Sequence, residues 1–504
     1  MTSWLEAFKR RRPNTAPKDA VAEALKNAGI EPAKTDDPSA APPSILDRLE
    51  RPDVTLAPSA TELTLPIRAA TMMPRPYQVD GIEFLRQKKR AMLGDAPGLG
   101  KTYQAIEAAV LPAIISCPLA LVGQWEEFIK EQYPAEPVTV AAYGDIIKRT
   151  EAIEAHAKAG GWLIVNHDMW RTFFIKQPVE TLIVDEFHHM RNREAKRSKG
   201  LWIKAQLTPR VYGLTATPVF KDVGDLYHLL HILDKEKYSS YWSFISRYAV
   251  VDNYGYGTKI VRMRSARLVE KETADLIMGR SYKQVGMFLP QRIDKHVMLR
   301  LTGPARERYD KLKNYYRLEL EKEDEDGNTS KLFANAGAVL HALRKLTVTP
   351  EKIAAIKEII EDTPGDAPIL VFTWYRETAA LLAEQLGGAE ITGSMAPEMR
   401  RDVARGMTGQ RVRVATMSSL SEGVDLSDFR TVIFSEETYV PGQQYQALSR
   451  VLRHRTDTTT TDHSPVILHW VRYIQTVDQI VHRTVRDRID GNAMTVLREA
   501  LEQN

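Results

Sequence analysis

The stretch Asp95-Ala96-Pro97-Gly98-Leu99-Gly100-Lys101-Thr102 decides how this sequence is interpreted. Its glycines let the backbone turn tightly and aim N–H groups at phosphate oxygens. Lys101 would neutralise the outer phosphates of a nucleotide, and the Thr102 hydroxyl would ligate Mg²⁺. Residues 103–110 can form a helix, which would place the bound anion at a helix N-terminus. The stretch therefore predicts a phosphate-binding loop, although Asp95 stands where the first glycine of such loops is expected.

An acidic pair lies downstream of this loop. Asp185 and Glu186 follow the apolar run Leu182-Ile183-Val184 and precede Phe187-His188. Asp185 would hold Mg²⁺ through its water shell, and Glu186 would orient and polarise an attacking water. Two carboxylates at a strand end are often merely solvated. Their order and spacing behind a phosphate loop favour the catalytic interpretation.

The composition sets limits on the class of protein. With 504 residues, 43% hydrophobic and 27% charged, the chain can form about three soluble domains. It has no apolar run of about 18 residues and no apolar N-terminal segment, so we expect no membrane partner and no secretory signal. The single cysteine, Cys117, excludes an intrachain disulfide and a Cys-based zinc site, and it fits a reducing cytosol. A net charge of +4 permits a nucleic-acid partner without requiring one.

The residue pattern changes along the chain. Residues 1–70 are rich in Ala and Pro and predict a flexible N-terminal extension. Beyond them, short apolar runs alternate with amphipathic stretches, which predicts an α/β fold of parallel strands joined by crossover helices. We expect a first lobe at 71–235 and a second at 346–504. Between them, residues 236–345 carry apolar residues at helical spacing and predict a helical insertion.

Eight short apolar runs predict strands of these two lobes. They are Ala113–Cys117, Trp162–Asn166, Thr181–Val184, Val211–Leu214, Ile369–Thr373, Val412–Thr416, Thr431–Phe434 and Val466–Trp470. Ligand sites in parallel sheets lie at the carboxyl ends of strands. The acidic pair falls at such an end.

Several blocks in the first lobe, taken together, resemble superfamily-two helicases of the Swi/Snf-type branch of DNA translocases. Pro76-Tyr77-Gln78 is similar to the family's adenine-reading block, which implies that Gln78 contacts the base. An aspartate is usual in this branch at the position of Asp95, so the departure noted above supports the resemblance. Asp185 to His188 resembles the DEAH form of the second motif, with Phe187 in place of alanine. Gly213 to Pro218 is similar to the third motif.

The resemblance continues in the second lobe and covers roughly residues 74–485. Val371 to Trp374 resembles the fourth motif, and Ser421 to Leu426, with Gly423 and Asp425, resembles the fifth. Gln443 to Arg453 resembles the sixth. The family uses arginines at the positions of Arg450 and Arg453 to stabilise charge on the γ-phosphate from across a cleft.

Two departures in the sixth motif put the rate and the coupling in doubt. Ser449 replaces a common glycine, and His454-Arg455 replaces the usual Gly-Gln. Two further features of the sequence, a basic stretch and a pair of tryptophans, each allow more than one interpretation. The basic stretch 191–210 either grips nucleic-acid phosphates or forms a solvated helix. Trp374 can stack on a base, whereas we expect Trp125 to be a core residue.

The resemblance implies two RecA-like lobes that bind ATP and Mg²⁺ between them. It implies an ATP-dependent DNA translocase or helicase, with duplex or forked DNA as partner and fork remodelling or annealing as its work. An RNA-dependent or strand-separating helicase is one alternative. A nucleic-acid-binding scaffold with weak ATPase activity is another. The compact chain suggests the cytoplasm of a prokaryotic cell or of a phage-infected host.

Overall fold

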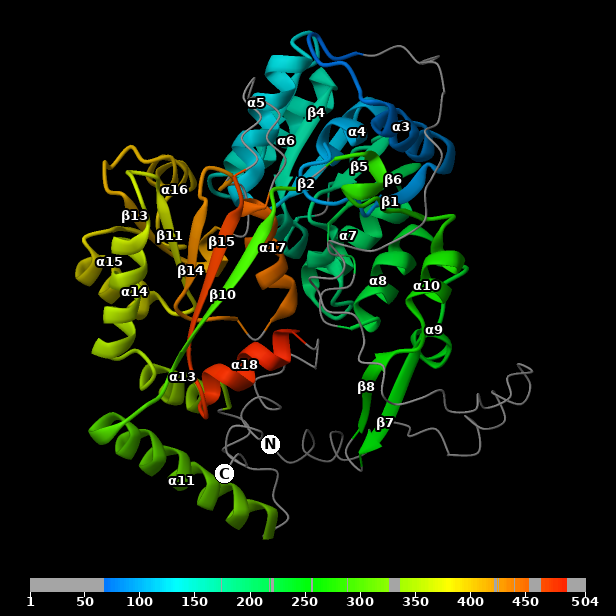
Figure 1. Ribbon diagram of the computed structural model, residues 1–504. Helices are drawn as coiled ribbons and strands as arrows, with labels where there is room; N and C mark the ends of the chain where they lie inside the picture. The colour runs from blue at the N-terminus through cyan, green and yellow to red at the C-terminus, as the bar shows by residue number, and fades with distance from the viewer. Residues whose placement is uncertain are drawn as a thin grey trace. The chain divides into compact units, whose positions relative to one another are not determined.

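The computed structural model describes residues 68–486 with internal gaps (Figure 1). The gaps are residues 174, 217, 219–221, 255–256, 288, 326–335, 421–423, 425, 439 and 453–463. The expected N-terminal extension, residues 1–70, therefore lies almost wholly outside the described residues. Among the helices that the structure describes, none combines the length and the apolar character needed to cross a membrane.

The first lobe is built on a parallel sheet. Seven strands of the described chain form it in the order β3-β4-β2-β5-β6-β1-β9, with every neighbouring pair parallel. Their bounds are β1 Arg90–Leu93, β2 Ala113–Cys117, β3 Val138–Val140, β4 Trp162–Asn166, β5 Thr181–Val184, β6 Arg210–Leu214 and β9 Ile277–Met278. The central strands are continuous apolar runs because helices cover both faces of the sheet.

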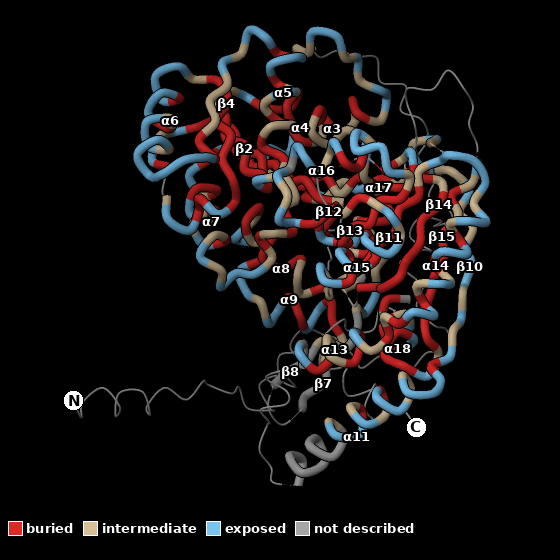
Figure 2. The backbone as a smooth tube through the Cα atoms, turned by 90° about the vertical axis from the view of Figure 1, so that its left-hand side faces the viewer, coloured by how far each residue is buried: buried red, intermediate tan, exposed pale blue. Residues whose placement is uncertain are grey.

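Each face of this sheet packs into its own hydrophobic core. On one face the core includes side chains from α3, α4 and α5, and on the other it includes side chains from α6, α7 and α8. These helices are α3 Pro76–Lys88, α4 Lys101–Ala108, α5 Val122–Gln132, α6 Ile146–Ala159, α7 Lys196–Gln206 and α8 Gly224–Leu233. The strands β2, β4 and β5 are buried along their whole length, and β2 and β4 run through the buried interior in Figure 2.

The second lobe has a parallel sheet of its own. Six strands of the described chain form it in the order β10-β15-β14-β11-β13-β12. Their bounds are β10 Arg292–Leu299, β11 Ile369–Thr373, β12 Ala389–Ile391, β13 Val412–Thr416, β14 Thr431–Phe434 and β15 Val466–Tyr473. Its helices are α14 Pro350–Asp362, α15 Arg376–Leu386, α16 Pro397–Ala404, α17 Pro441–Val451 and α18 Val477–Arg486. Helices α16 and α17 pack on one face, and α14 and α15 pack on the other.

Residues 236–345, expected as a helical insertion, contain both helices and strands. The helices are α9 Tyr241–Tyr248, α10 Ala266–Thr273, α11 Gly303–Glu325 and α13 Ala336–Lys345. An antiparallel hairpin, β7 Ala249–Tyr254 with β8 Gly257–Met263, lies between α9 and α10. Strand β9 joins the first sheet and β10 joins the second, so this segment contributes one strand to each lobe. The predicted domain boundaries stay a prediction.

The predicted α/β class with two parallel-sheet lobes is confirmed. Six of the eight predicted strands have the expected bounds, while β6 begins one residue earlier and β15 ends three residues later. Short 3-10 helices follow several strands. They are Leu119–Leu121, His167–Arg171, Phe187–Met190, Lys283–Val285 and Met417–Ser419.

Candidate functional site

Three neighbouring strands of the first sheet deliver the predicted nucleotide motifs to one edge. Strand β1 leads into the loop 94–100, β5 leads into Asp185 and β6 leads into Thr215, and these strands lie side by side in the order β5-β6-β1. All three are parallel, so their carboxyl ends meet at the same edge. The loops are thus brought together although more than a hundred residues separate the first from the last.

The phosphate-binding loop adopts the backbone that its glycines allow. Gly98 and Gly100 have φ angles of 78° and 74°, in the left-handed region that suits glycine. Helix α4 begins at Lys101, so Thr102 lies in its first turn, at the terminus that favours anions. The Lys101 Nζ donates to the carbonyl oxygens of Asp95 at 2.8 Å and Ala96 at 3.3 Å. A bound phosphate would therefore replace these two loop carbonyls as the hydrogen-bond acceptor of the Lys101 ammonium.

Gln78, the predicted adenine contact, lies against the phosphate-binding loop. Its Nε2 donates to the Leu99 carbonyl at 3.2 Å, and its Oε1 accepts from the Arg75 N–H at 2.9 Å, which caps helix α3. The side chain of Leu99 is fully buried beside Ala96. The Gln78 amide is thus fixed next to the loop, and its contact with a base stays a prediction.

Asp95 has a partner that the sequence did not reveal. Its carboxylate is fully buried and accepts from Arg280 Nε at 2.9 Å and Nη2 at 2.6 Å. Gln104 Nε2 lies 3.3 Å from the same carboxylate. Nothing in the local sequence around Arg280 marks it, except that it follows a short apolar run and a glycine. In this structure Asp95 therefore acts on the loop through protein contacts.

The first residue of the acidic pair, Asp185, accepts hydrogen bonds from helix α5 and from the neighbouring backbone. The Asp185 Oδ2 accepts from the indole Nε1 of Trp125 at 3.0 Å, and its Oδ1 accepts from the Glu186 N–H at 2.9 Å. Trp125 is 3% exposed, so the expectation of a core residue is confirmed. Burial, together with the neighbouring charge of Glu186, raises the pKa of Asp185 to about 6. A bound cation would stabilise the ionised form of such a buried carboxylate.

Glu186 is connected to the third motif through His188. Its Oε2 lies 3.3 Å from His188 Nδ1, and the same nitrogen lies 3.1 Å from Thr215 Oγ1. Glu186 has a φ angle of 44°, which is uncommon for a residue with a side chain and indicates local strain. Burial raises the pKa of Glu186. The hydrogen bond from His188 and the charges of His188, Arg450 and Lys101 outweigh burial and hold the pKa below its ordinary value.

Arg450 brings the second lobe into the electrostatics of this site. It lies near the C-terminal end of α17, half-buried, and its backbone carbonyl accepts from the Leu426 N–H at 3.2 Å. Burial is the main cause that lowers the pKa of Lys101, and the positive charge of Arg450 lowers it further. The same charge also lowers the pKa of Glu186.

Three predicted site residues cannot be placed. Arg453, Gly423 and Asp425 lie outside the described residues. Helix α17 ends at Val451, with Leu452 as its C-cap.

The oxygen donors of the site fit Mg²⁺. The Asp185 carboxylate and the Thr102 hydroxyl are oxygen donors of the kind that Mg²⁺ prefers. The described residues contain no group of three or more His, Cys, Asp or Glu side chains arranged to hold a metal alone. This suits an ion that proteins bind with one or two carboxylates together with nucleotide phosphates.

The basic stretch 191–210 is largely used within the protein. Lys204 is 2% exposed, and its Nζ donates to the Ile175 and Gln177 carbonyls at 3.0 and 2.5 Å. Arg210 pairs with Glu180 at 2.9 Å, and Lys199 pairs with Glu194 at 2.9 Å. These pairs favour a structural role for much of the stretch over a continuous phosphate grip.

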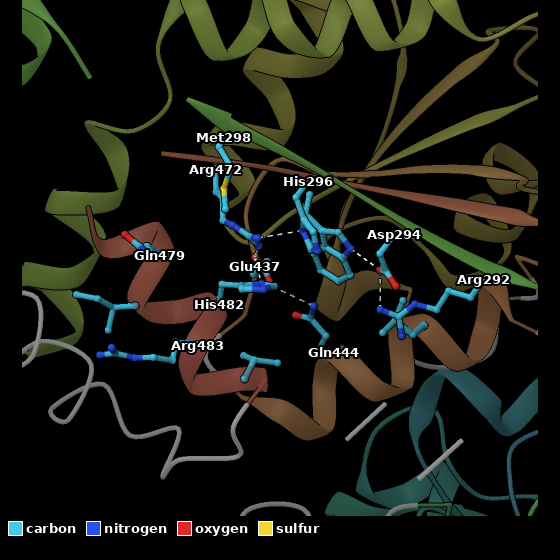
Figure 3. Close-up of a pocket in the computed structure, with 14 residues that line it drawn as sticks. Arg292, Asp294, His296, Met298, Glu437, Gln444, Arg472, Gln479, His482 and Arg483 are labelled. Atoms are coloured by element: carbon cyan, nitrogen blue, oxygen red, sulfur yellow. Dashed lines mark hydrogen bonds and ion pairs between the residues drawn. The ribbon is translucent and has the colours of Figure 1, made fainter. Parts of the chain in front are cut away.

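A pocket of about 470 Å³ lies in the second lobe, apart from the predicted site residues (Figure 3). Strands β10 and β15 and helices α17 and α18 line it. Several of its charged side chains pair with one another. Glu437 accepts from His482 Nδ1 at 3.0 Å, Arg472 Nη2 donates to His296 Nδ1 at 2.9 Å, and Arg292 contacts Asp294 at 2.6 Å. Burial and the charge of Arg472 lower the pKa of His296.

The fold and these loops define a class of protein. Two parallel-sheet lobes, a glycine-rich loop before a helix and an acidic strand end are typical of two-lobe nucleotide-dependent motors. Comparison with known families identifies the particular one. Residues 77–352 match the SNF2-related domain, and residues 351–455 match the helicase conserved C-terminal domain. Since the first match alone spans more than half of the 504 residues, the chain belongs to the SNF2-related family.

Curated relatives agree with this family. The DNA annealing helicase and endonuclease ZRANB3 of Bos taurus is 25% identical over 401 residues, covering 75% of this chain and 37% of the relative. The SWI/SNF-related matrix-associated actin-dependent regulator of chromatin subfamily A-like protein 1 homolog of Caenorhabditis elegans is 22% identical, covering 82% of this chain and 61% of the relative. The chain thus spans less than two thirds of these relatives' lengths.

Among solved structures, the SWI2/SNF2 ATPase core of Sulfolobus solfataricus in complex with dsDNA is similar. It is 19% identical and covers 88% of this chain and 100% of its own, with a TM-score of 0.41.

Proposed function

We propose that this protein is a DNA-dependent ATPase that uses ATP hydrolysis between its two lobes to move along duplex or forked DNA. One observation carries the proposal. Strands β1, β5 and β6 bring the phosphate-binding loop, Asp185 and Thr215 together at one edge of the first sheet. Membership of the SNF2-related family and its helicase C-terminal domain supports the same activity. The cytoplasm of a prokaryotic or phage-infected cell stays a prediction.

Each predicted residue has a defined task in this proposal. Lys101 leaves the carbonyls of Asp95 and Ala96 and neutralises the β- and γ-phosphates. Glu186, kept ionised by His188, orients and polarises the attacking water. Arg450 stabilises the charge that develops on the transferred phosphoryl group.

Mg²⁺ would be held by Thr102 and Asp185, and when bound it neutralises charge on the β- and γ-phosphate oxygens. The contact between His188 and Thr215 would couple a change at Glu186 to the third motif, which contains Thr215. Gly423, Asp425 and Arg453 are proposed, by resemblance, to complete the nucleotide site from the second lobe.

DNA is proposed as the track because of the family and of its relatives' names. ZRANB3 is described as a DNA annealing helicase, and we propose related work on forks for this chain. Motors that follow the phosphate backbone need few base contacts, so little sequence specificity is expected.

The nucleic-acid dependence of ATP hydrolysis tests this proposal. Steady-state hydrolysis is measured with Mg²⁺ and with no polymer, duplex DNA, forked DNA, single-stranded DNA or RNA. We expect duplex or forked DNA to raise the rate by about tenfold or more, in a salt-dependent manner. Lys101→Ala should abolish hydrolysis, while Lys158→Ala, which changes an exposed lysine of the same lobe, should not.

Two outcomes would favour other functions. Stimulation by RNA alone would indicate an RNA-dependent helicase. DNA binding without hydrolysis, unchanged by Lys101→Ala, would indicate a nucleic-acid-binding scaffold. A strand-displacement assay then separates translocation from unwinding.

A further inference from the structure

Residues 276–282, called here the seam, run alongside the phosphate-binding loop from a distant part of the chain. Strand β9 pairs with β1 in parallel, and the pairing continues past both strands. Gly94 N–H donates to the Met278 carbonyl at 2.6 Å, and Ala96 N–H donates to the Arg280 carbonyl at 2.9 Å. The seam thus holds the backbone of the loop on one side up to the residue before Pro97.

The Arg280 side chain joins three elements around the nucleotide site. It is 7% exposed. Its guanidinium donates to both oxygens of Asp95 in the loop, to Gln104 Oε1 of α4 at 2.8 Å, and to the Tyr77 carbonyl at the start of α3. Its backbone N–H also donates to Asp95 Oδ1 at 3.1 Å. A planar guanidinium suits such a forked, buried arrangement, and a lysine cannot reproduce it.

A glycine in helix α3 shows that this arrangement constrains the sequence. Gly81 lies inside the helix, where glycine ordinarily costs stability. A Cβ at this position would collide with Gln104 Oε1 and lie 2.8 Å from Arg280 Nη2. Close approach of the Arg280 network therefore requires the glycine.

The contacts of Arg280 determine whether an unneutralised carboxylate lies near Lys101. Asp95 is fully buried, so a negative charge on it has no solvent to screen it. Lys101 Nζ already contacts the Asp95 backbone carbonyl at 2.8 Å. Because Arg280 neutralises the Asp95 carboxylate through two hydrogen bonds, that carboxylate does not compete with phosphate for Lys101.

We propose that Arg280 is a positioning residue for nucleotide binding, which neutralises Asp95 and so keeps Lys101 available to the phosphates of ATP. This inference rests on the proposed ATPase function. It assigns to Asp95 an indirect role, exerted through Arg280 and the loop. It also connects the segment between the two lobes to nucleotide affinity.

The test compares Arg280→Gln with the double variant Asp95→Asn/Arg280→Gln. We expect Arg280→Gln to raise the KM for ATP about tenfold and to change kcat less than threefold, because an unpaired Asp95 carboxylate then attracts Lys101. In the double variant the competing charge is gone, so we expect KM to return to within about threefold of the wild type. Lys283→Gln, at an exposed cation of the same segment, is the matched control and should leave KM unchanged.

Thermal unfolding separates this role from a merely structural one. A structural role alone lowers the unfolding midpoint in both variants and leaves the KM of the folded protein unchanged, which would overturn the proposal. A double variant whose KM is as high as that of Arg280→Gln would overturn it as well. If Arg280→Gln does not fold, Arg280→Lys is measured by the same criterion, with an expected rise in KM of about threefold.

Failure of the underlying function has a different signature. A wild-type protein that neither hydrolyses ATP nor binds a fluorescent ATP analogue contradicts the proposed function itself. A wild-type protein that does both, with an unchanged KM in Arg280→Gln, contradicts only the role of Arg280.

Discussion

The charged residues of the nucleotide loops and those of the second-lobe pocket are arranged in opposite ways. In the pocket, opposite charges meet directly, as Arg292 meets Asp294 at 2.6 Å and His482 meets Glu437 at 3.0 Å. In the loops, Lys101 donates to backbone carbonyls and Asp185 accepts from an indole. The pocket charges thus pair with one another, whereas Lys101 and Asp185 are held by neutral groups that a ligand can replace. The predictions below test that difference.

The largest expected effect is on hydrolysis in Arg450→Ala. An arginine that stabilises transferred phosphate charge contributes on the order of 10³-fold or more to kcat. We therefore expect kcat with saturating duplex DNA to fall about 10³-fold, while the Kd for ATP changes little. Arg405→Ala, which alters an exposed arginine of the same lobe, is the control and should retain wild-type hydrolysis. Loss of ATP binding together with activity would argue against this role.

Glu186→Gln should have the next largest effect. The amide keeps the size of the side chain but cannot polarise water, so we expect single-turnover hydrolysis to slow about 100-fold. ATP binding should persist. Glu194→Gln, at an exposed glutamate near the same motif, should hydrolyse ATP normally. A Glu186→Gln protein with more than a tenth of wild-type activity would exclude Glu186 as the residue that activates water.

The pocket network should affect stability instead of hydrolysis. Glu437→Gln weakens the contacts with His482 and Arg472, at a cost of about 2 kcal/mol in the free energy of unfolding. Urea denaturation measures this cost, with the exposed Glu384→Gln as control. Because none of the predicted nucleotide-site residues lines the pocket, kcat should stay within about twofold. A tenfold loss of kcat at unchanged stability would break the distinction between the two regions.

The smallest effect concerns the pH dependence of stability in Asp185→Asn. The pKa of Asp185 is about 6 in the folded protein, above its ordinary value of 3.8. The native state therefore binds this proton more tightly than the unfolded chain, and ionisation of Asp185 lowers stability as pH rises from about 4 to 6. Without nucleotide, Asp185→Asn should gain stability relative to wild type as pH rises from about 4 to 6, and the two should converge below pH 4.

Denaturant titrations at pH 4, 5, 6 and 7.5 measure this convergence. Asp168→Asn, at an exposed carboxylate of the same lobe, should follow the wild-type profile. A difference between Asp185→Asn and wild type that does not vary with pH would show that the Asp185 carboxyl group titrates at its ordinary pKa.

The sequence predicted the interior strands well because both faces of these strands are buried, so nearly every residue in them is apolar. Strands such as Trp162–Asn166 and Ile369–Thr373 are buried along their whole length, and four consecutive apolar residues begin each of them. Edge strand β10 has three consecutive exposed polar residues, Asp294, Lys295 and His296, so no continuous apolar run marks it. Strand β9 has two residues, too few for any periodicity to be recognised.

The candidate site was predictable where its chemistry is local in sequence. The loop at Gly98 to Thr102 and the pair at Asp185 and Glu186 are short motifs whose spacing follows from phosphate and metal chemistry. Arg280 contacts Asp95 across 185 residues, and its local sequence carries no signal of that contact. The contact of Trp125 with Asp185 is similarly long-range. Such pairs depend on which strands become neighbours in the sheet.

The central claim is that the nucleotide site is completed by the second lobe, and a distance between the lobes tests it most directly. Cys117 is buried, so spin labels can be attached selectively at Lys158→Cys in the first lobe and Glu384→Cys in the second, which are both exposed positions. In the Glu186→Gln background, Mg²⁺ and ATP should shorten the distance between the labels, and Arg450→Ala should remove most of that change. An ATP-bound distance equal to the ligand-free one, or an identical shortening without Arg450, would contradict the claim.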